Sequence, residues 1–206
     1  MTRLDIFADP VCPWSLIAKL ELDRALESRP DHPFAVTWHP FRLNPQIAPE
    51  GVDRIAHLKA TMGADGAEAM RLLVEQSAAM GLTLNPAPRE PNTMDAHRLM
   101  HWAGLEQAQS RVMSGLMRAH WQEARDIADH DQLADIAAAA GMDRDVTLRL
   151  LASDADRDEI TTRELHARER GITVCPTFIV ADAHAVTGAQ PAKLWQDVID
   201  EIAAKG

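Results

Sequence analysis

Short apolar segments typical of strands lie at both ends of the chain, and apolar residues at helical spacing fill the stretch between them. The second of these segments ends near Pro40, and a proline there should stop the pairing of the strand or place it at a sheet edge. The expected elements are strand, helix and strand over residues 3–8, 13–28 and 34–41, then strand, strand and helix over residues 177–180, 185–187 and 191–204.

The middle of the chain, from about residue 52 to 169, predicts helices only. Asn92-Thr93 offers one N-cap, Asp131 offers another, and Gly141 is a good helix stop. The expected helices span residues 52–62, 65–80, 93–104, 107–124, 130–140, 144–151 and 154–170.

This order of elements predicts an α/β fold, in which a thioredoxin-like sheet domain carries a large inserted all-helical domain. The sheet domain is discontinuous and comprises residues 1–51 and 171–206, and the helical insertion comprises residues 52–170. The last helix of the insertion, at about 154–170, is also a candidate to pack on the sheet. A chain of 206 residues is long enough to be stable without a disulfide or a metal.

The clearest candidate chemistry is the segment Cys12-Pro13-Trp14-Ser15, between the first strand and the first helix. A Cys-x-x-Cys at such a junction is typical of a redox motif, and here Ser15 replaces its second cysteine. Unpaired N–H groups and the helix dipole favour a thiolate at Cys12, and Pro13 suits the first helical position. The Ser15 hydroxyl can donate to that thiolate, but it cannot attack a mixed disulfide. The alternative makes Cys12 a small buried apolar residue.

Composition and charge argue against two classes of partner, nucleic acids and membranes. A net charge of −10 without a basic stripe argues against a nucleic-acid partner. No stretch approaches the roughly 20 apolar residues that span a bilayer, and Asp5 and Asp9 interrupt the region of a signal-peptide core. We therefore expect no membrane partner and a complete, cytoplasmic chain, in which a structural disulfide is disfavoured.

Five short segments carry a resemblance to a known family. They are Asp-Pro-Val-Cys-Pro-Trp at 9–14, Pro-Phe-Arg-Leu-Asn-Pro at 40–45, Asn-Thr-Met-Asp-Ala-His-Arg at 92–98, Gly-Ile-Thr-Val-Cys-Pro-Thr-Phe at 171–178 and Thr-Gly-Ala-Gln at 187–190. In this order, over almost the entire chain, they resemble the DsbA family and most closely its cytoplasmic FrnE-like branch. That branch is related to 2-hydroxychromene-2-carboxylate isomerase and kappa-class glutathione transferase.

The resemblance implies a thioredoxin fold with an inserted helical domain, and disulfide oxidoreductase or isomerase activity at Cys12. It also implies that Pro176 is cis and lies beside Cys12. The chain departs from the family at Ser15 and at Cys175, where valine or threonine is common. Cys175 is then a packed apolar residue, a relocated resolving thiol, or a partner of Cys12 in a metal site. Two sulfurs do not complete a tetrahedral site, so we expect no metal.

Further residues are expected around the cleft. Trp14 should lie at its rim, His97 falls on the third family segment, and Phe41 and Asn44 follow the second strand as a far wall. The complete set of substrate-binding candidates is Pro13, Trp14, Cys175, Pro176, His97, Phe41 and Asn44.

The first functional hypothesis is a DsbA-like thiol–disulfide oxidoreductase that acts through Cys12 and is released from its mixed disulfide by glutathione or Cys175. Its partners are protein or small-molecule thiols and disulfides, glutathione is a co-substrate, and no cofactor is tightly bound. One alternative is a glutathione-dependent isomerase or transferase of the hydroxychromene-carboxylate isomerase or kappa class. Another is a redox-inert thioredoxin-fold binding protein. The oligomeric state stays open, a homodimer included.

Overall fold

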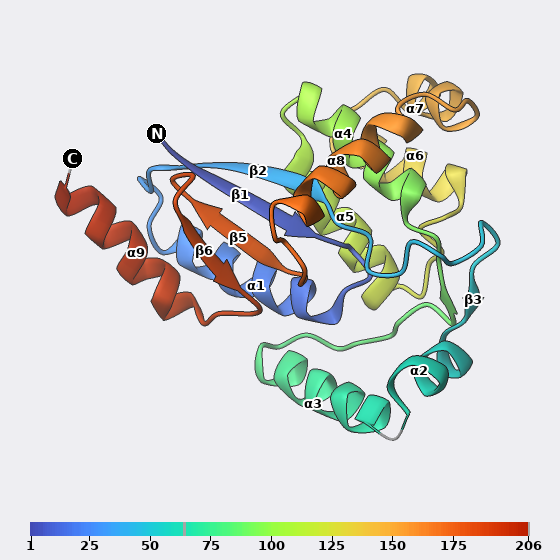
Figure 1. Cartoon of the computed structure of the whole chain (residues 1–206), viewed down its shortest axis with the longest axis horizontal. Coiled ribbons are helices and arrows are strands. Elements are labelled where there is room, and N and C mark those ends of the chain that lie inside the picture. Colours follow the sequence, from blue (N-terminus) through green and yellow to red (C-terminus); the bar gives the residue numbers. More distant parts are fainter. Residues whose placement is uncertain (64, 206) are drawn as a thin grey trace.

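The computed structural model describes residues 1–63 and 65–205 (Figure 1). Its main sheet has the strand order β2-β1-β5-β6. β1 runs parallel to β2 and antiparallel to β5, and β6 continues antiparallel to β5. The two ends of the chain therefore form one sheet, as the order of elements predicts. The strands are β1 (Thr2–Ala8), β2 (Phe34–Pro40), β5 (Thr177–Val180) and β6 (His184–Thr187).

One face of the sheet is covered by α1 (Pro13–Glu27) and α9 (Ala192–Lys205), which contact each other (Figure 1). Leu4, Ile6 and Ala8 alternate along β1, so their side chains share the face toward these helices, and all are 0% exposed. β2 is an edge strand that ends at Pro40, as predicted for a residue without a backbone N–H.

The helix α8 (Arg157–Glu169) contacts β2. Phe7 and Ala167 belong to a second, smaller apolar cluster that also includes Phe41 and Ile172. An ion pair of 2.8 Å between half-buried Arg42 and buried Glu164 ties the chain after β2 to α8. Apolar packing and this ion pair thus hold α8 against the chain around β2.

The other helices form two groups in Figure 1: α2 and α3 contact each other in the lower part of the view, with α3 also contacting α1, and α4 to α7 gather at the upper right. The expectation of helices only in this stretch is wrong, because β3 (Val52–Asp53) pairs with β4 (Arg89–Glu90). Two-residue strands are too short to give a periodic pattern. The helices are α2 (Arg54–Met62), α3 (Asp65–Ala79), α4 (Met94–Leu105), α5 (Gln109–Trp121), α6 (His130–Ala139) and α7 (Arg144–Leu151).

One helix cap differs from the expectation, and another lies where it is expected, with Asn92 accepting a hydrogen bond from the backbone of Met94 at 2.9 Å. Asp129, and not Asp131, caps α6, where its carboxylate accepts a hydrogen bond from the backbone of Gln132 at 2.9 Å. Thr93 occupies the N-cap position of α4 but makes no capping bond, because its hydroxyl instead donates to Asp9 at 3.1 Å. That bond ties α4 to the segment before the first helix.

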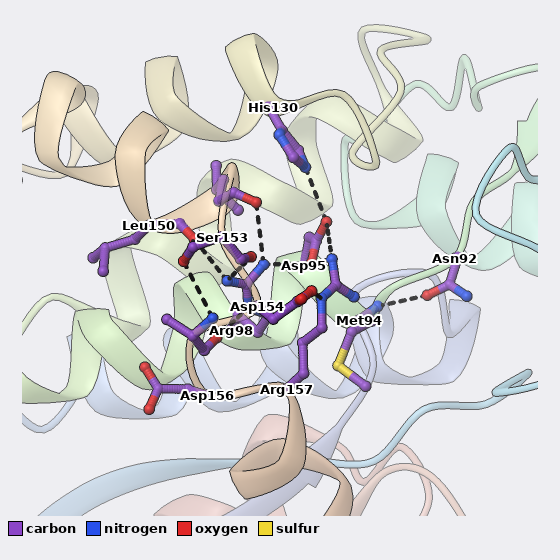
Figure 2. Close-up of polar contacts among 12 residues, drawn as sticks. Asn92, Met94, Asp95, Arg98, His130, Leu150, Ser153, Asp154, Asp156 and Arg157 are labelled. Atoms are coloured by element: carbon purple, nitrogen blue, oxygen red, sulfur yellow. Dashed lines mark hydrogen bonds and ion pairs between the residues drawn. The ribbon is translucent and has the colours of Figure 1, made fainter.

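A buried arginine fixes the connection between α7 and α8 (Figure 2). Arg98 on α4 is 0% exposed and donates to the carbonyl oxygens of Leu150, Ser153 and Ala155 at 2.6 to 2.8 Å. Its charge is paired with Asp95 at 2.8 Å. Burial of the charge is therefore compensated by an ion pair and several charge-assisted hydrogen bonds.

Candidate active site

Cys12 occupies the N-cap of α1, directly after the strand β1 and a short connecting segment. Its backbone is extended (φ −76°, ψ 118°), its side chain makes no capping bond, and Pro13 begins the helix. The backbone N–H of Cys12 donates to the carbonyl oxygen of Asp9 at 3.0 Å, which closes the turn before the helix. The sulfur is therefore held at the positive end of α1, as the sequence predicts.

Cys175 meets Cys12 from the other end of the chain. Its peptide bond to Pro176 is cis, which is the isomer that the resemblance implies. Thr177 follows at once and pairs with Phe7, so antiparallel pairing brings this loop to the end of β1. The Cys12 thiol lies 3.5 Å from the carbonyl oxygen of Cys175 and donates to it.

Ser15 joins this pair as a third group. Its hydroxyl oxygen lies 3.1 Å from the sulfur of Cys175, and its side chain is buried. The Ser15 position, which carries the second sulfur in a Cys-x-x-Cys motif, is thus filled by a hydroxyl that contacts a sulfur from elsewhere in the chain.

The environment shifts the pKa values of the two thiols in opposite directions. A hydrogen bond from the Cys175 side chain lowers the pKa of Cys12 although burial opposes it, and the hydroxyl and backbone N–H of Ser15 lower it further. Burial raises the pKa of Cys175, and its hydrogen bond to Cys12 adds to that effect. Cys12 is therefore the sulfur that ionises first, with Cys175 as the donor that stabilises its thiolate.

A largely apolar cavity of about 300 Å³ opens beside the two cysteines. Cys12 itself is 1% exposed and lines this space, whereas Trp14 is 36% exposed. The lining residues are Val11, Cys12, Pro13, Trp14, Leu43, Asn44, Arg54, His57, Leu58, Thr61, Met70, Glu90, Trp121 and Cys175. The candidates Cys12, Pro13, Trp14, Asn44 and Cys175 thus surround one space.

Three substrate-binding candidates do not line this cleft, which corrects the expectation: Pro176, which is buried next to Cys175, and His97 and Phe41, which lie elsewhere. His97 is buried with its Nε2 3.7 Å from Asp9, on the side of Asp9 that faces α4. Phe41 is buried in the second apolar cluster, where the Arg168 guanidinium lies 4.2 Å from its ring centre. None of the three residues lines the cavity beside Cys12.

Asp9 organises the segments around the cysteine. It is 0% exposed and accepts hydrogen bonds from the backbone of Leu43 at 2.7 Å, from Thr93 at 3.1 Å and from the backbone of Val11 at 3.4 Å. These partners come from the loop after β2, the start of α4 and the active-site turn itself. Asp9 therefore fixes the cavity wall relative to Cys12.

Sequence reasoning missed the charged end of the cavity. Arg54, at the start of α2, lies 3.3 Å from the carboxylate of Glu90 on β4, and both residues are about 5% exposed. Burial raises the pKa of Glu90 to about 7 against the opposing effect of Arg54. These residues are 36 positions apart (90 − 54), and no local pattern in the sequence marks them as partners.

Two other kinds of feature are absent from the part of the chain that the structure describes. Within residues 1–63 and 65–205, no group of three or more His, Cys, Asp or Glu side chains is arranged to hold a metal ion. In the same described part of the chain, no helix is long and apolar enough to cross a bilayer.

Comparison with known structures places the fold. A probable DsbA oxidoreductase from Streptomyces coelicolor is 28% identical, with a TM-score of 0.88 over 100% of this chain and 92% of its own. A 2-hydroxychromene-2-carboxylate isomerase is 16% identical, with a TM-score of 0.74 over 98% and 97% of the two chains. The cytosolic disulfide reductase DsbM from Pseudomonas aeruginosa, solved with GSH, is 16% identical, with a TM-score of 0.68 over 98% and 99%.

The family assignment rests on the sequence match. No curated protein matches the chain. The DSBA-like thioredoxin domain, however, matches residues 3–200, and the structures above share its fold. The chain therefore belongs to the DSBA-like thioredoxin domain family.

Proposed function

We propose that this protein is a thiol–disulfide oxidoreductase that acts through a single nucleophilic cysteine, Cys12. One observation carries the proposal: the Cys12 sulfur lies at the N-terminus of α1, 3.5 Å from the carbonyl oxygen of Cys175, and lines the cavity. The lowered pKa of Cys12 supplies the thiolate that such an attack needs.

The reaction has two exchange steps. The Cys12 thiolate attacks one sulfur of a disulfide, which forms a mixed disulfide on Cys12 and expels the other sulfur as a thiolate. A second thiolate then attacks the mixed disulfide, which restores the Cys12 thiolate and forms a new disulfide with the released group. These two steps balance as a disulfide exchange, since one disulfide and one thiolate are consumed and one disulfide and one thiolate are formed. Full reduction of the substrate needs one further exchange, in which a second molecule of the releasing thiol attacks the new mixed disulfide, expels the remaining substrate thiolate and leaves the releasing thiol as its own disulfide.

Release has two routes, through glutathione or through Cys175. If Cys175 attacks, the product is an internal Cys12–Cys175 disulfide, which an external thiol must then reduce. The raised pKa of Cys175 keeps it in its thiol form near neutral pH, so an external thiol such as glutathione is the faster releasing group. Cys175 acts in the first step as the hydrogen-bond donor to Cys12.

The geometry favours this reaction over the two alternatives. A glutathione isomerase or transferase that uses serine needs the hydroxyl to meet the glutathione sulfur. Ser15 is 1% exposed, contacts Cys175 and does not line the cavity. A redox-inert binding protein has no use for a cysteine whose pKa is lowered by three hydrogen bonds.

The proposed substrates are small or flexible thiols and disulfides, because Cys12 is 1% exposed and lines a cavity of about 300 Å³. We propose a cytoplasmic location, which the similarity to a reductase described as cytosolic supports. Reduced glutathione is available to such an enzyme as the second substrate.

The proposal is tested by steady-state turnover of bis(2-hydroxyethyl) disulfide with glutathione, coupled to glutathione reductase and NADPH. Wild type should turn over, and Cys12→Ser should fall to the uncatalysed rate. Cys175→Ser should retain turnover if glutathione is the releasing group. Equal rates for wild type and Cys12→Ser, or no rate above background for either, would contradict the proposal.

A further inference from the structure

The charged end of the active-site cavity has the arrangement of a ligand subsite. Arg54 and Glu90 both line the cavity that contains Cys12, and they lie 3.3 Å apart. A pair of opposite charges buried for stability alone would be expected to satisfy its polar atoms within the protein. This pair leaves one nitrogen and one oxygen uncommitted.

The uncommitted nitrogen is Nη1 of Arg54. The Nε group donates to the carbonyl oxygen of Ala87 at 2.8 Å, and Nη2 is shared between His120 and Glu90. The guanidinium carbon also lies 4.9 Å from the ring centre of Trp121, so the group is held in one orientation. Among the described residues, Nη1 has no hydrogen-bond partner, and it is not sealed from solvent.

The uncommitted oxygen is Oε1 of Glu90. Its Oε2 faces Arg54, whereas Oε1 accepts no hydrogen bond from any residue that the structure describes, and it too is not sealed off. His120 is buried, and burial together with the Arg54 charge lowers its pKa well below the usual range. His120 is therefore neutral and accepts from Arg54, so it adds no second cation to the subsite.

We propose that Arg54 and Glu90 bind the α-amino-acid group of a low-molecular-weight thiol or disulfide whose sulfur is exchanged at Cys12. An α-ammonium and an α-carboxylate on one carbon match a carboxylate and a guanidinium that lie side by side. The ligand ammonium donates to Oε1 of Glu90, and the ligand carboxylate accepts from Nη1 of Arg54. This inference rests on the proposed function and names the substrate class of the same site.

The raised pKa of Glu90 agrees with this role, because a carboxyl group that is partly neutral in the free protein becomes fully ionised when an ammonium binds it. The raised pKa of Glu90 also means that Glu90→Gln should disturb the folded structure little, since the neutral glutamine retains the shape and the hydrogen bonding of the carboxyl group. Arg54→Gln would instead leave Glu90 and His120 without their partner, so Glu90→Gln is the variant of choice.

The test compares three reagents by the rate at which each modifies Cys12: glutathione disulfide, its N-acetyl derivative and bis(2-hydroxyethyl) disulfide. Wild type should react with glutathione disulfide about tenfold faster than with the N-acetyl form, as expected for one charge-assisted hydrogen bond. In Glu90→Gln this preference should disappear, because the variant and the acetylation remove the same contact. Arg71→Gln, on the exposed side of α3 and paired with Glu68 and Glu75, is the matched control and should keep it.

The outcomes separate this inference from the proposed function. Equal rates with acetylated and free glutathione disulfide in wild type, or the same preference in wild type and Glu90→Gln, would overturn the subsite while leaving Cys12 as the nucleophile. Failure of all three reagents to modify Cys12 would overturn both.

Discussion

The Cys12 thiol lies 3.5 Å from the carbonyl oxygen of Cys175, although the two residues are 163 positions apart. The first strand delivers one residue and the last antiparallel pair of strands delivers the other, so each end of the chain supplies one half of the site. Cys175 contributes a carbonyl oxygen to the Cys12 thiol and an S–H donor to the Cys12 thiolate. The reactivity of Cys12 should therefore depend on residue 175.

The first prediction concerns that dependence. Cys175→Ala removes the S–H donor and should raise the pKa of Cys12, whereas Cys175→Ser keeps a donor and should raise it less. Alkylation by iodoacetamide near neutral pH should be several-fold slower in the alanine variant. The pH dependence of the alkylation rate gives the measurement, and an identical midpoint in the two variants would show that Cys175 does not act as a donor.

A second prediction concerns the fate of a glutathione adduct. If Cys175 resolves the adduct, Cys175→Ser should retain it after free glutathione is removed, while wild type releases it and forms a Cys12–Cys175 disulfide. If glutathione alone releases it, as proposed above, the adduct should persist equally in both proteins until glutathione is added. Disulfide mapping by mass spectrometry of the two proteins decides between the routes.

The pH dependence of substrate preference follows from Glu90. Its pKa of about 7 means that the carboxylate forms as pH rises from about 6 to 8, so the preference for free over N-acetylated glutathione disulfide should rise over this range. Taking the ratio of the two rates cancels the ionisation of Cys12. The charged groups that act on Glu90 are Arg54 and Asp9, and His57 lines the same cavity. A ratio that is flat from pH 6 to 8 would contradict this prediction, and Glu90→Gln should give that flat profile.

Arg98 provides a prediction about stability. Arg98→Met leaves four carbonyl oxygens and the Asp95 carboxylate without their shared donor, so it should lower the free energy of unfolding by about 3–5 kcal/mol. The control Arg144→Met removes ion pairs from an arginine that is 40% exposed, and should cost much less, because solvent screens these pairs. Urea unfolding measures both, and similar losses would refute the role given to burial.

Much of the fold follows from local sequence patterns. Apolar periodicity predicts the first helix over 13–28 and a later one over 144–151, and the structure has helices at Pro13–Glu27 and Arg144–Leu151. The motif at Cys12 indicates where the nucleophile lies, because a strand followed at once by a helix positions that residue. The proximity of Cys175 came from the family resemblance, since nothing local in the sequence relates the two cysteines.

What the sequence could not reveal depends on contacts between distant segments. The β3–β4 pair has too few residues for a pattern, and the pairing of Arg54 with Glu90 depends on where that short ladder places them. His97 lies in a family segment, yet its side chain meets Asp9 and not the cavity. Side-chain direction at such positions is set by tertiary packing.

The central claim is that Cys12 is the nucleophile, and the most direct test is the site of a brief reaction with glutathione disulfide at neutral pH. Intact mass and peptide mapping should show one glutathione per chain, attached to Cys12, and no adduct in Cys12→Ser. An adduct on Cys175 in the wild-type protein, or no adduct on either cysteine, would contradict the account.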